Sequence, residues 1–146
     1  IFFTKGVIET IKKLNWVPDI IHVQGWMASL LPTYLKNYYR DEAIFADTKI
    51  VTSIFDEGFE GALSTSMHTK VAFDNLPKED IADFEKATYH NIMVNAVKNS
   101  DGVILASENI PLDLTKYIES SNKPFLPYAT KEAFAEAYTT FYNQFL

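Results

Sequence analysis

The sequence predicts an α/β fold with an open, mainly parallel sheet, in a three-layer Rossmann-like arrangement. Short apolar runs rich in β-branched residues indicate buried strands at 19–23, 49–55 and 102–107. Segments with helical periodicity lie between these runs, and strands that alternate with helices favour parallel pairing through right-handed crossovers. A chain of 146 residues is long enough for one domain with a real core, so we expect a single domain over 1–146.

The first predicted helix precedes the strand at 19–23, and the second follows it. Pro18 and Asp19 end the first helix, whose hydrophobic stripe consists of Val7, Ile8, Ile11 and Leu14. Gly25 ends the strand, and Pro32 is expected to shift or kink the first turn of the second helix. The side chains that we expect this second helix to bury are Leu30, Leu31, Tyr34, Leu35 and Tyr38.

The middle of the chain contains a long connection and a third helix. Residues 56–80 follow the second strand with two glycines and a proline, which predicts an irregular, functional or mobile loop. A helix is predicted over 81–98, and its inward-facing residues are Tyr89, Ile92, Met93, Ala96 and Val97. The Ser-Asp-Gly stretch ends this helix, and the third strand begins with its glycine, Gly102.

The C-terminal part of the sequence predicts two further helices. A short one spans 112–118, and a closing one carries a packing stripe of Phe134, Ala137, Tyr138, Phe141 and Phe145. We interpret this last segment as a closing helix at a natural C-terminus rather than as the start of a second sheet. Because the sequence begins with the apolar stretch IFFTKG and without Met, we interpret it as a piece of a longer chain. Function is expected at the carboxyl ends of the three strands.

Composition excludes several classes of function. The net charge of −6, from 19 acidic and 13 basic residues, disfavours a nucleic-acid surface and an anionic ligand held by this chain alone. No apolar run is long enough for a membrane span. The absence of cysteine excludes disulfides and thiolate chemistry, and it agrees with a reducing, cytoplasmic compartment. We expect no signal peptide and no cofactor.

Histidine and motif patterns favour no metal or nucleotide site. The sequence contains no GxGxxG, GxxxxGK[ST], HExxH or GxSxG motif. His68 and His90 have no ligand spacing, so a metal site is not expected. His22 lies inside the first strand, where a hydrogen-bonded core histidine is the alternative to a functional one.

Two features at the strand ends are candidates for chemistry. Asp56, Glu57 and Glu60 could act as acid or base if one were buried, or they could form a solvated acidic loop. The flanking glycines 58 and 61 allow backbone groups to approach a ligand, or simply make turns. Trp26 could stack on a sugar or a base, or it could anchor the second helix to the sheet.

The stretch PDIIHVQGWMASLLPTYL resembles a motif of the bacterial glycogen and starch synthases, which belong to glycosyltransferase family 5. The family motif reads PD-[IV]-[IV]-H-x-H-D-W-x-x-[AG]-L-x-P-x-Y-L. The matching residues are Pro18, Asp19, His22, Trp26, Leu30, Pro32, Tyr34 and Leu35. The segment KIVTSIFDEGFEG is similar to a second motif, a Lys and a strand followed by V-H-N-x-x-[YF]-Q-G, and matches it at Lys49, Phe59 and Gly61. NSDGVILASENIP is a looser match to a third motif, A-D-x-[IV]-x-[AT]-V-S-P.

Several polar groups of these motifs are replaced in this sequence. The acidic residue before the Trp is Gly25, and the second His of the first motif is Gln24. In the second motif, Phe55 stands in place of the His and Asp56 in place of the Asn. A phenyl ring cannot make the hydrogen bonds of an imidazole, and glycine offers no charge for an oxocarbenium-like transition state. No residue is therefore assigned a catalytic role.

The resemblance implies the N-terminal half of a GT-B glycosyltransferase. Such an enzyme is a retaining glucosyltransferase of glycogen biosynthesis that transfers glucose from ADP-glucose to an α-1,4-glucan. The C-terminal GT-B domain, which holds most nucleotide contacts, is not found in this sequence, so we expect the chain to be inactive alone. The alternative is a glucan-binding or regulatory module that has lost catalysis. In either case the expected substrate-binding residues are His22, Gln24, Trp26, Asp56, Glu57, Glu60 and Gly61.

Overall fold

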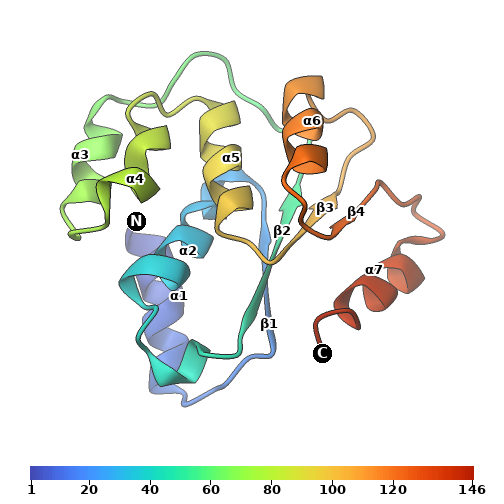
Figure 1. Cartoon of the computed structure of the whole chain (residues 1–146), viewed down its shortest axis with the longest axis horizontal. Helices are drawn as coiled ribbons and strands as arrows, with labels where there is room; N and C mark the ends of the chain where they lie inside the picture. Colours follow the sequence, from blue (N-terminus) through green and yellow to red (C-terminus); the bar gives the residue numbers. More distant parts are fainter.

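The computed structural model describes residues 1–146 and contains one parallel sheet of four strands (Figure 1). The strands follow one another across the sheet in sequence order, as β1 (Ile20–Gln24), β2 (Lys49–Ile54), β3 (Gly102–Leu105) and β4 (Phe125–Leu126). All three neighbouring pairs are parallel. The α/β, Rossmann-like fold class predicted from the sequence is therefore confirmed.

Seven α-helices accompany the sheet. Their bounds are α1 (Phe2–Lys13), α2 (Leu30–Thr33), α3 (Ser66–Ala72), α4 (Lys78–Ile81), α5 (Tyr89–Lys98), α6 (Leu112–Ser120) and α7 (Phe134–Tyr142). Short 3-10 turns occur at Trp26–Ala28, Ala43–Phe45 and Ala82–Phe84, and α2 continues into a π-helical turn at Tyr34–Tyr38. None of these helices combines the length and apolar character that a membrane crossing requires.

The helices divide unequally between the two faces of the sheet. Buried residues of α1, α2, α5 and α6 join one cluster with one face of the strands, and α7 alone packs on the other face. The three crossovers all move the chain in the same direction across the sheet. Right-handed crossovers in one direction leave their helices on one face, so the second face is covered only where the chain returns after β4.

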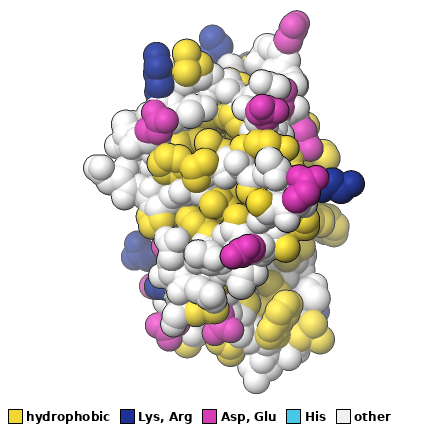
Figure 2. Space-filling model, turned by 90° about the vertical axis from the view of Figure 1, so that its right-hand side faces the viewer, with side chains coloured by type: hydrophobic (Ala, Val, Ile, Leu, Met, Phe, Trp, Pro, Cys, Tyr) yellow, Lys and Arg dark blue, Asp and Glu magenta, His cyan; other side chains and the backbone are white.

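The α7 face has a small core. Val51, Ile104 and Phe141 form its buried cluster, and aromatic side chains of α7 surround it. Gly102 lets α7 and the residues after it approach the sheet closely, because a Cβ there would lie 3.0 Å from Cζ of Phe141 and 2.5 Å from Cζ of Phe145. Figure 2 views the molecule from the side of β4 and α7 and shows hydrophobic side chains gathered across the middle of this surface, with acidic side chains around them.

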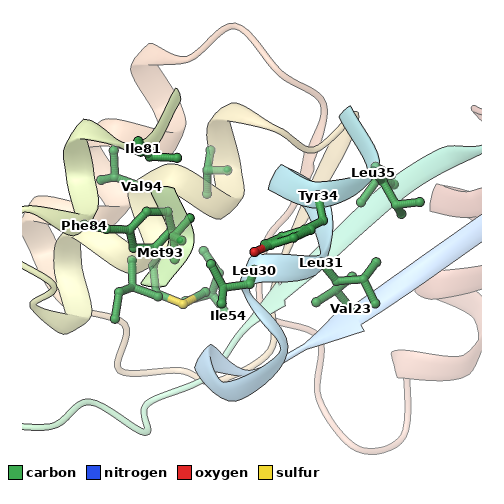
Figure 3. Packing of buried hydrophobic residues seen from close by; sticks show 14 of the residues in the cluster. Val23, Leu30, Leu31, Tyr34, Leu35, Ile54, Ile81, Phe84, Met93 and Val94 are labelled. Atoms are coloured by element: carbon green, nitrogen blue, oxygen red, sulfur yellow. The ribbon is translucent and has the colours of Figure 1, made fainter. Parts of the chain in front are cut away.

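The opposite face carries the main hydrophobic core, a cluster of 24 buried residues (Figure 3). Met93 of α5 is fully buried there and lies between Phe84 and the side chains of α2 and β2. Asn95, also fully buried, accepts a hydrogen bond from the Thr33 hydroxyl and donates one to the Asp80 carbonyl at 2.7 Å. This polar link ties α2, α4 and α5 together inside the core.

Two core positions predicted in the first two helices are wrong, each for a local geometric reason. Leu14 is 69% exposed because α1 ends at Lys13, and Leu14 already belongs to the turn that follows. Tyr38 is 46% exposed, and Tyr39 is buried in its place. The π-helical turn takes up an extra residue, which moves the buried face one position along the chain.

The long connection after β2 is more structured than the sequence indicated. It contains α3 and α4, and the predicted helix over 81–98 starts only at Tyr89, after the Thr88 hydroxyl accepts a hydrogen bond from Asn91 N–H. β4 was not predicted, because two residues between prolines carry no periodic signal. The stripe of α7 buries Phe141 fully, whereas Phe134 is half exposed.

Candidate functional site

The carboxyl ends of β1, β2 and β3 meet at one edge of the sheet, where the sequence predicted function. Gly25 N–H donates to the Ser53 carbonyl at 3.3 Å, and Asp56 N–H donates to the Ser107 hydroxyl at 3.0 Å. These bonds join the turn after β1 to β2, and the loop after β2 to the segment after β3. The three loops therefore form one continuous surface, which we call the strand-end site.

The turn after β1 depends on glycine. Gly25 adopts φ 73° and ψ 168°, a conformation that is open essentially to glycine alone. A Cβ at this position would lie 3.1 Å from Oε2 of Glu57, which belongs to the loop after β2. The absence of a side chain at residue 25 thus leaves space that a carboxylate of the neighbouring loop approaches.

Three aromatic rings form a row along the strand-end site. Trp26 and Phe59 meet edge to face, with ring centroids 4.9 Å apart, and Phe59 meets Tyr89 in the same way at 6.1 Å. The Tyr89 hydroxyl donates to the Phe55 carbonyl at 2.6 Å. Burial, together with the carboxylates of Glu57 and Asp56, raises the pKa of Tyr89 to about 12, so it remains a donor at neutral pH.

The acidic residues of this loop are solvated. Asp56, Glu57 and Glu60 are all exposed, and none of them forms an ion pair. The structure therefore matches the solvated alternative rather than a buried acid and base. Their carboxylates remain free to accept hydrogen bonds from a ligand.

The remaining predicted residues of the loop and strand lie at the same edge. Gln24 is exposed at the end of β1, and Trp26 is half-buried. Gly61 is exposed with φ 76° and has open space around its Cα, whereas Gly58 packs on the ring of Tyr89. Gly61 thus makes a turn and leaves its backbone accessible.

His22 lies apart from these residues, on the face covered by α7. Its Nε2 is 2.7 Å from the Ser53 hydroxyl and its Nδ1 is 2.8 Å from the Tyr142 hydroxyl. Burial lowers the pKa of His22 below its ordinary value. Because both ring nitrogens have protein partners, these contacts match the alternative of a hydrogen-bonded core histidine.

Two apolar grooves lie on the side of α1. The groove next to the strand-end site is about 590 Å³, and its lining residues are Phe3, Gln24, Trp26, Met27 and Ala28. The other, about 540 Å³, runs along α1 from Phe2 to Trp16 and is almost entirely apolar. We associate the first groove with the site, because two of its residues are among those predicted to bind substrate.

No metal centre is formed. The structure contains no group of three or more His, Asp or Glu side chains arranged around a common point. His90 instead lies 2.8 Å from the Asp113 carboxylate, and His68 belongs to α3.

Sequence reasoning missed Tyr89 and Met27 as members of this site. Ser107 ends the third predicted strand, at one of the three strand ends where function was expected, although it was not among the predicted substrate-binding residues. Tyr89 was predicted only as an inward-facing helix residue, and no sequence signal indicates that its hydroxyl reaches the Phe55 carbonyl across 34 residues.

Comparison with known proteins gives a consistent family match. The model of the starch synthase catalytic domain matches residues 1–120. A glycogen synthase of Chlorobium luteolum is 36% identical over 109 residues, which are 74% of this chain and 22% of that protein. Glycogen synthases of Chlorobium phaeovibrioides and Elusimicrobium minutum are 32% and 31% identical, over 78% and 79% of this chain and 23% and 24% of theirs.

This chain spans about a quarter of the length of these relatives. The matched region contains α1 to α6 and the first three strands, and with them the whole strand-end site. The chain therefore belongs to the starch synthase catalytic domain family.

Proposed function

We propose that this chain is the acceptor-side part of a glycogen or starch synthase-like glucosyltransferase and that it binds an α-1,4-glucan. The observation that carries the proposal is the family match over residues 1–120, which includes all three loops of the strand-end site. In this proposal the chain is part of the N-terminal half of a GT-B enzyme. The full enzyme transfers glucose from ADP-glucose to the glucan with retention.

The chemistry of the strand-end site suits a neutral sugar. Trp26 and Phe59 are half-buried, so their rings combine a packed side with a side open to stacking on sugar faces. The Gln24 amide and the free carboxylates of the β2 loop can accept hydrogen bonds from glucan hydroxyl groups. The groove of about 590 Å³ beside Trp26 is in the volume range of small-ligand sites.

The donor is assigned to another part of the enzyme. A nucleoside diphosphate sugar carries negative charge, and residues 53–63, which end β2 and form the loop after it, contribute three exposed carboxylates and no Lys or Arg. We therefore propose that ADP-glucose binds through a C-terminal domain outside this chain, and that the chain alone catalyses no transfer. No metal or cofactor is part of the proposal.

Gly25 and Phe55 favour a second candidate, a glucan-binding or regulatory module without catalysis. These residues stand where the family motifs have an acid and a histidine. A chimera separates the two candidates: this chain replaces the matched 109-residue segment of the Chlorobium luteolum glycogen synthase. Glucose transfer from ADP-glucose by the folded chimera supports the enzyme, and glucan binding without transfer supports the module.

Glucan binding by this chain can be tested with its two tryptophans, Trp16 and Trp26. In Trp16→Phe, Trp26 is the only indole, and we expect its fluorescence to change on titration with maltoheptaose. In the matched control Trp26→Phe, the remote Trp16 should not respond. ADP-glucose should produce no change in either variant. The proposal would be contradicted if the fluorescence of Trp26 did not change and calorimetry showed no heat on titration with maltoheptaose.

A further inference from the structure

The carboxylate of Glu57 occupies a distinctive place in the strand-end site. Its Oε2 lies 3.1 Å from where the Cβ of residue 25 would be, although residues 25 and 57 belong to loops after different strands. β1 and β2 are paired with Gln24 opposite Ser53, so the two loops leave the sheet side by side. Glu57 therefore lies directly over the backbone of the turn that carries Trp26.

Nothing in the protein uses this carboxylate. Glu57 forms no ion pair, and its side chain makes none of the hydrogen bonds of the strand-end site. Its Oε2 approaches the Gly25 turn, and its charge helps to raise the pKa of Tyr89, which belongs to the same site. The Glu57 carboxylate has no protein partner and lies at the same edge of the sheet as the exposed Gln24 amide and the row of aromatic rings. It is therefore well placed to accept hydrogen bonds from a polyhydroxylated ligand.

Gly25 makes this arrangement possible in two ways. Its positive φ turns the chain so that the 3-10 turn begins at Trp26, and its missing side chain leaves the space beside Oε2 empty. Alanine at this position would strain the backbone and bring a methyl group to 3.1 Å from the carboxylate oxygen. The glycine and the glutamate are thus geometrically complementary.

We propose that Glu57 is the carboxylate that contacts the glucan at this site, and that Gly25 favours this contact, because its positive φ sets the turn and its missing side chain leaves space beside the carboxylate. The inference rests on the function proposed above and names the residue that determines its polar specificity. The acidic group that the family motif has at residue 25 would then be provided here by the loop after the next strand. Of the three carboxylates in this loop, only Glu57 approaches the Gly25 turn in this way.

The test is calorimetric titration of the whole chain with maltoheptaose, using a charge-matched control. We expect Glu57→Gln to weaken binding roughly tenfold, because hydrogen bonds to an ionised acceptor are stronger than those to a neutral amide oxygen. Glu119→Gln removes the same charge from an exposed position in the last turn of α6, far from the strand ends, and should bind like the wild type. Gly25→Ala should weaken binding at least as much as Glu57→Gln, with folding checked by circular dichroism.

The outcomes separate the two proposals. If wild-type and Glu57→Gln chains bind maltoheptaose equally well, Glu57 is not the contact, while glucan binding stands. If the wild type does not bind, both proposals are overturned. Because Glu57 is exposed and unpaired, its substitution tests the inference even if Gly25→Ala fails to fold.

Discussion

The two faces of the sheet differ in how many buried residues pack against them. The face covered by α1, α2, α5 and α6 contains 24 clustered buried residues, whereas the face covered by α7 contains three. Both faces are built on the same four strands, so strand composition does not explain the difference. It follows from topology, because every crossover places its helix on the first face and only the segment after β4 reaches the second.

This comparison teaches that burial need not be shared evenly between the two faces of one small sheet. On the first face, side chains from helices far apart in sequence interdigitate around Met93 and Leu30 (Figure 3). On the second, a nine-residue helix rests on the sheet through Phe141, aromatic neighbours and the hydrogen bond of Tyr142 to His22. We therefore expect α7 to open locally at lower free energy than the rest of the chain.

The largest effect is expected for Met93→Ala on the first face. Met93 is fully buried, and truncating such a side chain costs about 2–5 kcal/mol of unfolding free energy, because it loses apolar burial and leaves a cavity. Urea denaturation should show a lower midpoint for the whole chain. A loss confined to α7, or a change below about 1 kcal/mol, would contradict the unequal division of the core.

A smaller global effect is expected for Phe141→Ala on the second face. The substitution removes the large ring of Phe141 from its cluster with Val51 and Ile104. We therefore expect α7 to undock while the first face remains packed. Hydrogen exchange should show amides of α7 exchanging roughly tenfold faster or more, since each 1.4 kcal/mol of lost docking is a factor of about ten. Exchange in α5 is the internal control, and equal acceleration there would show that both faces form one cooperative unit.

The smallest effect is expected from pH, through His22. Burial lowers its pKa from the ordinary 6.5, and the groups that face its ring are Tyr138 and Tyr142 of α7 and Ser53 of β2, all uncharged near neutral pH. The unfolded chain then binds a proton at a higher pH than the folded chain. The stabilisation is complete above about pH 6.5 and is lost as the pH falls toward the lowered pKa.

This pH effect can be isolated by difference. Unfolding free energies of wild type and His22→Gln should converge as the pH falls from about 7 to about 5, because every other titratable group is shared by the two chains and cancels in the difference. A constant difference between the two proteins over this range would show that the charge state of His22 does not contribute to docking of α7.

Much of the strand-end site followed from local pattern. The apolar runs that became β1, β2 and β3 are recognisable because buried parallel strands need β-branched residues on both faces. Residues directly after such runs must lie at one edge, and Gln24, Asp56 and Ser107 do. Tyr39 was not predicted to be buried because the π-helical turn that moves it inward has no signature in the hydrophobic period.

The sequence by itself determined the parallel α/β fold, the family and the edge of the sheet where the loops after β1, β2 and β3 meet, because these depend on local periodicity and short motifs. Only the tertiary structure decided that Glu57 approaches Gly25, that Phe59 bridges Trp26 and Tyr89, and that His22 faces α7. Each of these contacts joins segments about 30 to 120 residues apart, and their geometry depends on strand register and on the backbone path of loops. Neither register nor loop path is encoded in any short stretch of residue types, so these contacts arise only when the whole chain packs.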